Sequence, residues 1–153
     1  MTAVIQRVNK ACVYTDGVYN GEIAKGLYIL LGVARGDEKL DAELLAEKIS
    51  KLRIFSDENG KLNLSVMDID GEIMTVSNFT LNANYSHGNR PDYFASADPR
   101  TANELYEYFL SLIDKKVRKT AYGKFGSDMR TEMETDGPVT IVMTSDVLRG
   151  GKK

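Results

Sequence analysis

Apolar residues in the first part of the chain follow the spacing of β-strands. Residues 3–14 are rich in β-branched side chains and predict a strand. The Asp16-Gly17 pair is a hairpin turn signal that leads into a second strand over residues 18–24. Residues 27–33 form a continuous apolar run, which is typical of a strand buried on both faces. The N-terminal part is therefore expected to contribute three strands.

Two later segments carry apolar residues at helical spacing. Asp37 is a candidate cap for a helix over residues 38–52. Asp98 followed by Pro99 is a start signal for a second helix, which is expected to run to about residue 116. The core-facing residues of the two helices are expected to be Leu45, Ile49, Leu52, Leu105, Phe109, Leu112 and Ile113.

Five further strands are predicted at residues 62–67, 72–81, 117–122, 129–135 and 139–144. The total is about eight strands and two helices, in the order β-β-β-α-β-β-α-β-β-β. Two helices cannot cover both faces of so much sheet. We therefore expect an α/β fold, a single three-layer α/β/β domain over residues 1–144. Residues 145–153 are expected to form a solvated C-terminal tail.

Composition narrows the class of protein. The 153 residues are 42% hydrophobic and 27% charged, with a net charge of -2, which argues against a dedicated polybasic nucleic-acid binder. A single cysteine, Cys12, excludes an intramolecular disulfide, and a single histidine, His87, excludes a zinc site with several His or Cys ligands in one chain. We expect no metal and no cofactor. The longest apolar stretch, residues 27–34, is too short to span a membrane, so a cytoplasmic protein without membrane association is expected.

Two short segments are candidates for chemistry. Residues 77–81 read Ser-Asn-Phe-Thr-Leu and place polar side chains at the end of an apolar strand, and residues 136–140 read Asp-Gly-Pro-Val-Thr. Taken alone, each is better explained as an ordinary strand edge or turn than as a functional site. His87 lies in a polar stretch and is expected to be a solvated loop residue, while Cys12 is expected to be a buried, inert thiol.

Motifs spread along the chain give it a family resemblance. In order they are Ala3-Val4-Ile5-Gln6-Arg7-Val8, Leu30-Leu31-Gly32-Val33, Leu52-Arg53-Ile54-Phe55, Ser77-Asn78-Phe79-Thr80-Leu81, Asn89-Arg90-Pro91, Gly123-Lys124-Phe125-Gly126-Ser127-Asp128-Met129 and Gly137-Pro138-Val139-Thr140. With these motifs the sequence resembles the D-aminoacyl-tRNA deacylases over residues 1–144. Two positions depart from the family pattern: Asn78 stands where the family has Gln, and Thr135 where it commonly has Asn.

The resemblance implies an editing hydrolase. Family members cleave the ester that joins a D-amino acid, or glycine, to the terminal adenosine of tRNA, and they leave L-aminoacyl-tRNA intact. They are homodimers with active sites at the interface, where a cis Gly-Pro element from one subunit enters the pocket of the other. Carried onto this sequence, the resemblance gives that element to Gly137 and Pro138, the pocket lining to Ser77, Asn78, Phe79 and Thr80, the support of the Gly-Pro element to Arg7, and the shaping of the site to Phe125 and Met129.

Two mechanisms stay open at this point. Hydrolysis of an activated ester needs a positioned water and donors for a developing oxyanion, and backbone N–H groups near Phe79 and Thr80 are suitable donors. In one reading the Thr80 hydroxyl is the nucleophile, but the sequence offers no base to activate it. In the other, which we favour, the neighbouring ribose 2′-hydroxyl of the tRNA activates or orients water.

Binding only the acceptor end of tRNA requires few phosphate contacts. Arg90, Lys115, Lys116, Arg118 and Lys119 are candidates for these contacts, with a solvated basic face as the equal alternative. Two rival functions also remain. One is a non-catalytic dimeric RNA-binding module of the same fold, a reading left open by Asn78, and the other is a threonine-nucleophile ester hydrolase.

Overall fold

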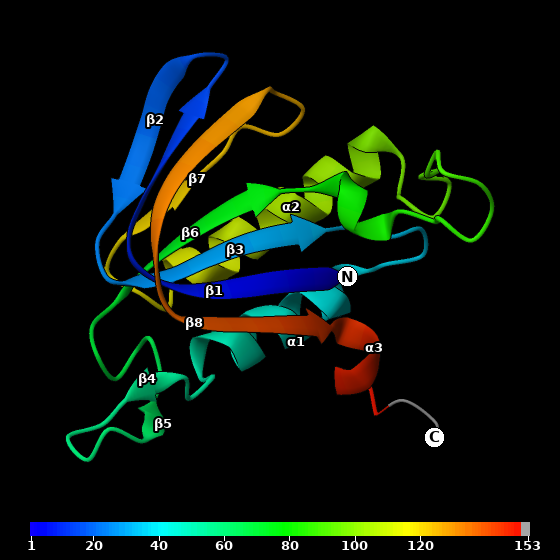
Figure 1. Ribbon diagram of the computed structural model, residues 1–153. Helices are drawn as coiled ribbons and strands as arrows, with labels where there is room; N and C mark the ends of the chain where they lie inside the picture. The colour runs from blue at the N-terminus through cyan, green and yellow to red at the C-terminus, as the bar shows by residue number, and fades with distance from the viewer. Residues whose placement is uncertain (151–153) are drawn as a thin grey trace.

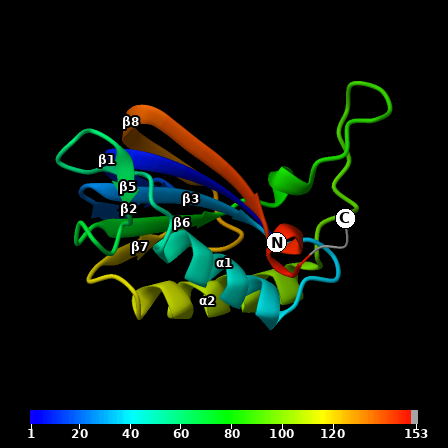
Figure 2. The same cartoon turned by 90° about the horizontal axis from the view of Figure 1, so that it is seen from below.

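A computed structural model describes residues 1–150 of the chain. It has three layers (Figure 1): two helices, a strongly bent sheet, and a second strand layer formed where that sheet folds back on itself. Both long helices lie on the same side of the sheet, as Figure 2 shows. Within residues 1–150, none of the helices combines the length and apolar character needed to cross a membrane.

The six-stranded sheet is organised around its first strand, β1 (Thr2–Thr15). One edge of β1 pairs antiparallel first with β3 (Gly26–Gly32) and then with β2 (Val18–Ile23), and the other edge pairs along its whole length with β8 (Met129–Thr144). The sheet continues from β3 through two parallel neighbours, β6 (Glu72–Ser77) and β7 (Thr120–Tyr122). A separate two-stranded sheet is formed by β4 (Phe55–Ser56) and β5 (Leu62–Leu64).

The core lies on both faces of the bent sheet. The larger cluster is buried between the sheet and the helices α1 (Lys39–Ser50) and α2 (Pro99–Asp114). A smaller cluster is enclosed where β2 and the distal halves of β1 and β8 curl over β3, β6 and β7. The larger cluster includes Ile5, Leu27, Ile29, Leu31, Leu45, Ile49, Ile73, Leu105, Phe109 and Ile113, and the smaller one Val8, Val13, Ile23, Tyr28, Met74 and Val76. The α/β fold class and the helix stripe at Leu45, Ile49, Leu105, Phe109 and Ile113 are confirmed.

Several element boundaries differ from the predictions. The observed order is β-β-β-α-β-β-β-α-β-β-α, with the short helix η1 between β6 and α2. The strand predicted over residues 72–81 ends at Ser77, because η1 (Phe79–Asn82) follows it. The two strands predicted over residues 129–144 are one continuous strand that carries a bulge. The two-residue strand β4 is too short to give a periodic signal.

The start of α1 also differs from the prediction. Glu38 is the N-cap, and its backbone N–H donates to the Asp41 carboxylate at 2.7 Å. Asp37 instead accepts hydrogen bonds from the backbone N–H of Ala34 and from the N-terminal ammonium group, each at 2.6 Å. Asp98 caps α2 as predicted, accepting from the backbone N–H of Thr101 at 3.1 Å.

The prediction of a solvated tail after residue 144 is wrong for residues 145–149, which are folded against the rest of the protein. This segment forms the short helix α3 (Ser145–Leu148), in which Ser145 is fully buried and donates its backbone N–H to Met1. Arg149 donates to Asp41 at 2.7 Å and to Glu38 at 3.2 Å, which ties the segment to α1. The sequence pattern missed this anchor because its interactions are polar and distant in sequence. Residues 151–153 of the expected tail lie outside the described part of the chain.

This anchor predicts a stability difference that depends on pH. Burial alone would raise the pKa of Asp41, but hydrogen bonds from Arg149 and the Glu38 N–H lower it to about 2. Arg149→Met leaves the buried carboxylate without its main partner, so we expect a loss of about 2 kcal/mol in unfolding free energy at pH 7. A carboxylate with a lowered folded-state pKa stabilises above its ordinary pKa, about 3.9, and that stabilisation is lost as the pH falls towards 2.

The measurement is urea unfolding of the wild-type and Arg149→Met proteins between pH 7 and pH 2.5. The difference between their unfolding free energies should become smaller below about pH 4. The matched control is Arg100→Met, which removes an exposed ion pair with Glu104 and should cost about 0–1 kcal/mol. Equal costs for the two substitutions, or a difference that does not change with pH, would contradict the anchor.

Candidate active site

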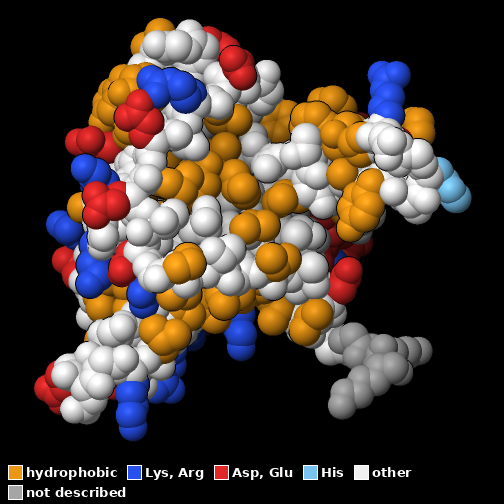
Figure 3. Space-filling view, in the orientation of Figure 1, with side chains coloured by type: hydrophobic (Ala, Val, Ile, Leu, Met, Phe, Trp, Pro, Cys, Tyr) orange, Lys and Arg blue, Asp and Glu red, His pale blue; other side chains and the backbone are white. Residues whose placement is uncertain are grey.

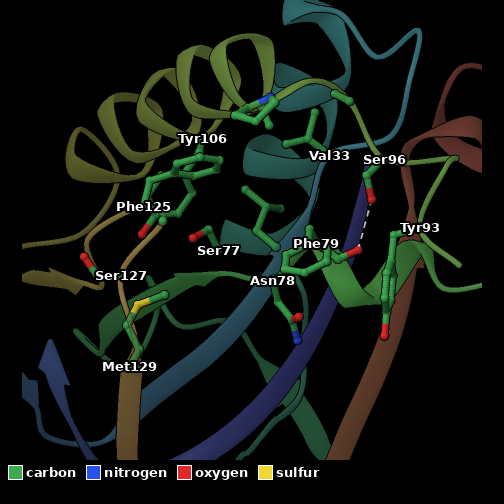
Figure 4. A pocket seen from close by; sticks show the side chains of 15 residues that line it. Val33, Ser77, Asn78, Phe79, Tyr93, Ser96, Tyr106, Phe125, Ser127 and Met129 are labelled. Carbon is green, nitrogen blue, oxygen red and sulfur yellow. Dashed lines mark hydrogen bonds between the residues drawn. The ribbon is translucent and has the colours of Figure 1, made fainter. Parts of the chain in front are cut away.

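A cavity of about 500 Å³ opens where β6 ends, α2 begins and the chain leaves β7. The carboxyl ends of the parallel strands β3 and β6 meet there, with Leu31 paired to Ser77. Figure 4 shows Ser77 between Phe125 on one side and Phe79 on the other. The lining is mainly apolar and consists of Leu31, Val33, Ser77, Asn78, Phe79, Tyr93, Ser96, Ala97, Pro99, Ala102, Tyr106, Phe125, Gly126, Ser127 and Met129.

Tyr106 fixes one wall of this cavity. Its buried hydroxyl donates to the Gly123 carbonyl at 2.7 Å and lies 3.1 Å from the carbonyl of Thr75, while the Phe125 ring packs 6.1 Å from its own ring. Burial raises the pKa of Tyr106 far above its usual value, so the hydroxyl remains protonated. Tyr106 therefore holds the strand β6 to the turn after β7 and does not act as a base.

Gly123 makes room for another lining residue. A Cβ atom on Gly123 would lie 2.1 Å from the sulfur of Met129, so only glycine allows the methionine to take its observed position. Met129 starts β8, and its side chain lines the cavity below Ser77 and Phe125 in Figure 4. The packing of Met129 in the turn over residues 123–129 thus depends on glycine at position 123.

The polar side of the cavity is formed where β6 passes into η1. Asn78 is the N-cap of η1, and its side-chain oxygen accepts hydrogen bonds from both the backbone N–H of Thr80, at 3.2 Å, and the Thr80 hydroxyl. The Thr80 N–H is therefore already occupied. No hydrogen bond of the Phe79 backbone N–H is found within residues 1–150, and Phe79 is a lining residue of the cavity.

Phe79 forms the lip of the cavity together with Tyr93. The two rings meet edge to face with centroids 5.1 Å apart, and the Phe79 side chain is 59% exposed. Ser96 donates its hydroxyl to the Phe79 carbonyl at 3.3 Å (Figure 4), and Asn82 donates to the Val33 carbonyl at 2.9 Å. These bonds fix η1 against the segment that leads into α2.

Gly137 and Pro138 lie elsewhere, on a bulge of β8. Their peptide bond is cis, both residues are exposed, and neither lines the cavity. The buried Arg7 supports the bulge: its Nε atom lies 3.2 Å from the Asp136 carbonyl and 3.0 Å from the Asp136 carboxylate. A second guanidinium nitrogen donates to the Ile54 carbonyl at 2.8 Å, which connects the bulge to the start of β4.

The structure brings only part of the predicted site together. Five predicted residues line the cavity, namely Ser77, Asn78, Phe79, Phe125 and Met129. Arg7, Gly137 and Pro138 form a second cluster, and Thr80 belongs to neither. Sequence reasoning missed Tyr93 and Ser96, which carry no motif signal, and Tyr106, whose spacing on α2 is that of an ordinary core residue. It also gave no role to Ser127, although this residue lies within the motif of residues 123–129.

Other candidate residues lie outside the cavity lining. His87 is exposed in a loop, and Cys12 is half-buried rather than fully buried as expected. Lys115 to Lys119 follow the far end of α2, and three of their side chains are engaged: Lys116 with Glu47, and Arg118 and Lys119 with Glu72. Among residues 1–150, no three His, Cys, Asp or Glu side chains come together in a group suited to a metal ion.

Residues 4–144 match the family described as D-Tyr-tRNA(Tyr) deacylase. The chain belongs to this family. It is 49% identical to the D-aminoacyl-tRNA deacylase of Thermosipho melanesiensis over 146 residues, covering 95% of this chain and 97% of that protein. It is also 49% identical to the D-aminoacyl-tRNA deacylase of Geotalea daltonii over 143 residues, covering 94% and 95%. The resemblance found in the sequence is confirmed, and with it the expectation of a hydrolase.

Solved structures show the same fold. A structure described as c-Myc DNA Unwinding Element Binding Protein superposes with a TM-score of 0.88 at 39% identity, covering 94% of this chain and 97% of that one. A probable eukaryotic D-amino acid tRNA deacylase superposes with a TM-score of 0.77 at 14% identity, covering 94% and 99%. The second likeness supports the deacylase fold alone.

Proposed function

We propose that this protein hydrolyses the ester bond of D-aminoacyl-tRNA, and of glycyl-tRNA mischarged on tRNA for alanine, as a cytoplasmic editing enzyme. The observation that carries the proposal is the composition of the cavity: apolar walls, an unpaired backbone N–H, and no ionisable side chains except two tyrosines. An aminoacyl ester is activated, so its hydrolysis requires positioning and oxyanion stabilisation more than strong acid–base groups. Membership of the deacylase family gives the substrate class.

The Phe79 N–H is the proposed oxyanion donor. It is held at the cavity wall by Asn78 on one side and by the hydrogen bond between Ser96 and the Phe79 carbonyl on the other. A backbone donor fixed in this way needs little reorganisation when negative charge develops on the ester oxygen. The Thr80 N–H, which the sequence also suggested, is already bonded to Asn78 and is not proposed for this role.

Water is proposed to be activated by the 2′-hydroxyl of the terminal ribose rather than by Thr80. The Thr80 hydroxyl donates its proton to an amide oxygen of Asn78, which is not a base, and Thr80 does not line the cavity. No histidine, carboxylate or amine lines the cavity either. A reacting group on the substrate itself is therefore the simplest source of the proton acceptor.

Selection against L-aminoacyl-tRNA is proposed to come from Gly137 and Pro138 of a second copy of this chain. The pair is exposed and rigidly supported by Arg7, yet it is absent from the cavity of its own chain. Hydrophobic side chains also gather on the open sheet face (Figure 3), and Val142 on β8 is 68% exposed, which suits contact with another copy. Backbone atoms inserted into the pocket exclude an L side chain by steric conflict.

The first test uses purified protein with D-tyrosyl-tRNA and L-tyrosyl-tRNA in parallel. We expect hydrolysis of the D form only, and no loss of activity in EDTA. Loss of activity on chelation, with recovery after addition of a divalent ion that binds the protein, would contradict the proposed chemistry. Inactivity on every D-aminoacyl-tRNA would favour the non-catalytic RNA-binding module instead.

Thr80→Ala separates the two mechanisms. Removal of a supporting hydroxyl costs about 1 kcal/mol, or several-fold in rate, whereas removal of a nucleophile costs several powers of ten. We expect the variant to retain most of its single-turnover rate, and we expect a substrate that ends in 2′-deoxyadenosine to be hydrolysed very slowly. Two results together would make Thr80 the nucleophile: a Thr80→Ala protein that is folded but inactive, and normal cleavage of the 2′-deoxy substrate by the wild-type protein.

Hybrid dimers test the contribution of the second copy. Ser127→Trp fills the cavity, and Gly137→Ala disturbs the bulge, because the residue has φ of +131° and its new Cβ would lie 2.7 Å from the Val139 nitrogen. Each variant alone should be inactive. Random co-refolding of equal amounts makes about half of the dimers hybrids, and each hybrid has one intact site of two, so about a quarter of the wild-type activity should return. No recovery in hybrids, or sedimentation as a 17.0 kDa species alone, would rule out a shared site.

A further inference from the structure

We propose that the rim of the cavity binds the single-stranded acceptor end of tRNA, with cations on its phosphates and aromatic rings on its bases. The rim is defined by Arg35, Lys124, Arg90, Tyr85 and Phe94. The inference rests on the proposed function, because it assigns how the same cavity receives the rest of its substrate.

The three cations of the rim are exposed and free of ion pairs. None of them takes part in the ion pairs found within residues 1–150. The backbone N–H of Arg35 donates to the Ala95 carbonyl at 2.8 Å, immediately before the lining residue Ser96. Lys124 directly precedes the lining residue Phe125. The two residues therefore lie beside lining residues in two different segments, and both are exposed without an ion pair within residues 1–150.

Arg90 lies further out, in the loop between Asn84 and Asp92. This loop projects beyond the end of the sheet next to η1 (Figure 1), and the single histidine marks its outer edge in Figure 3. Its base is fixed by two backbone hydrogen bonds of 2.9 Å between Asn84 and Asp92, and by a side-chain bond between the same residues at 3.0 Å. A loop closed in this way presents its residues at a defined distance from the cavity.

Tyr85 and Phe94 stand on either side of that closed base. Their side chains are 80% and 79% exposed, more than any other large hydrophobic side chain in the described part of the chain. The Phe94 N–H is bonded to the Asp92 carboxylate at 3.2 Å, so the backbone below the ring is ordered. Exposed rings on an ordered backbone, next to unpaired arginines, are the features by which proteins stack unpaired bases.

The charge distribution favours RNA over an apolar protein partner for this surface. The nearby carboxylates of Asp92 and Asp98 are already used to accept backbone N–H groups from Phe94 and Thr101. At the other end of α2, which is about 24 Å long, most of the basic side chains are held in ion pairs. Phosphates that follow the terminal adenosine out of the cavity therefore meet the rim first, and an alternating set of cations and rings suits a short single strand.

The test compares two substrates in the intact protein: D-tyrosyl-tRNA, and D-tyrosyl-adenosine, which has no phosphate. Arg35→Gln, Arg90→Gln and Lys124→Gln should each lower kcat/KM several-fold for the tRNA and leave the value for the adenosine ester unchanged. Each should also reduce the slope of log affinity against log salt by about 1 for a labelled acceptor-stem RNA with its single-stranded end. Phe94→Ser should weaken RNA binding without changing that slope.

The matched control is Lys61→Gln. Lys61 lies between β4 and β5, is exposed and forms no ion pair within residues 1–150, so its substitution should leave kcat/KM unchanged for both substrates. Equal losses of kcat/KM on both substrates would mean that the rim residues act in the pocket itself. An unchanged slope of log affinity against log salt would show that they do not contact RNA phosphates. Variants that sediment as monomers would assign the surface to contact between copies. A wild-type protein that binds the RNA through the rim but cleaves neither substrate would overturn the proposed function and leave the rim intact.

Discussion

The antiparallel pairing of β1 with β8 is the constraint on which both halves of the candidate site depend. It joins the first strand of the chain to the last one along their full lengths. Its register shifts between Gln6 and Val8, where Arg7 lies, and again between Val8 and Lys10. The extra residues of β8 leave the ladder at the first of these shifts, so Gly137 and Pro138 stand clear of the sheet. The Arg7 side chain fills the gap and bonds to Asp136. The same pairing bends the distal ends of both strands over the sheet and delivers Met129 to the cavity.

The parts of the fold that the sequence predicted are those governed by a local rule. The continuous apolar run that became β3 and the Asp-Pro start of α2 were recognised because burial and capping act within a few residues. The helix α3 was missed because the contacts of Arg149 with Glu38 and Asp41 join residues more than a hundred positions apart. The bulge divided β8 into two apparent strands, because a Gly-Pro pair interrupts the pattern without ending the ladder.

The same distinction applies to the cavity. Ser77, Asn78 and Phe79 were found because they form a motif, and Phe125 and Met129 because the resemblance extends to their turn. Thr80 shares the motif but turns away, since a single helical turn begins at Phe79 and rotates the next side chain out of the lining. The departure at Asn78 has a local explanation: an asparagine oxygen reaches the backbone N–H two residues ahead, as in an Asx-turn, so the shorter side chain closes η1 from within.

A net charge of -2 agrees with the proposal that this protein contacts only the acceptor end of a tRNA. Binding along a duplex requires many cations on one face, since each phosphate contact contributes a similar increment of affinity. Most of the basic residues at the far end of α2 are engaged in ion pairs with Glu47 on α1 and Glu72 on β6. The basic side chains that stabilise the fold are thereby separated from those of Arg35, Arg90 and Lys124, which form no ion pair within residues 1–150 and lie on the proposed path of the single strand. The balance of charges therefore agrees with the proposal that this surface binds only the terminal nucleotides of an RNA and not a long duplex.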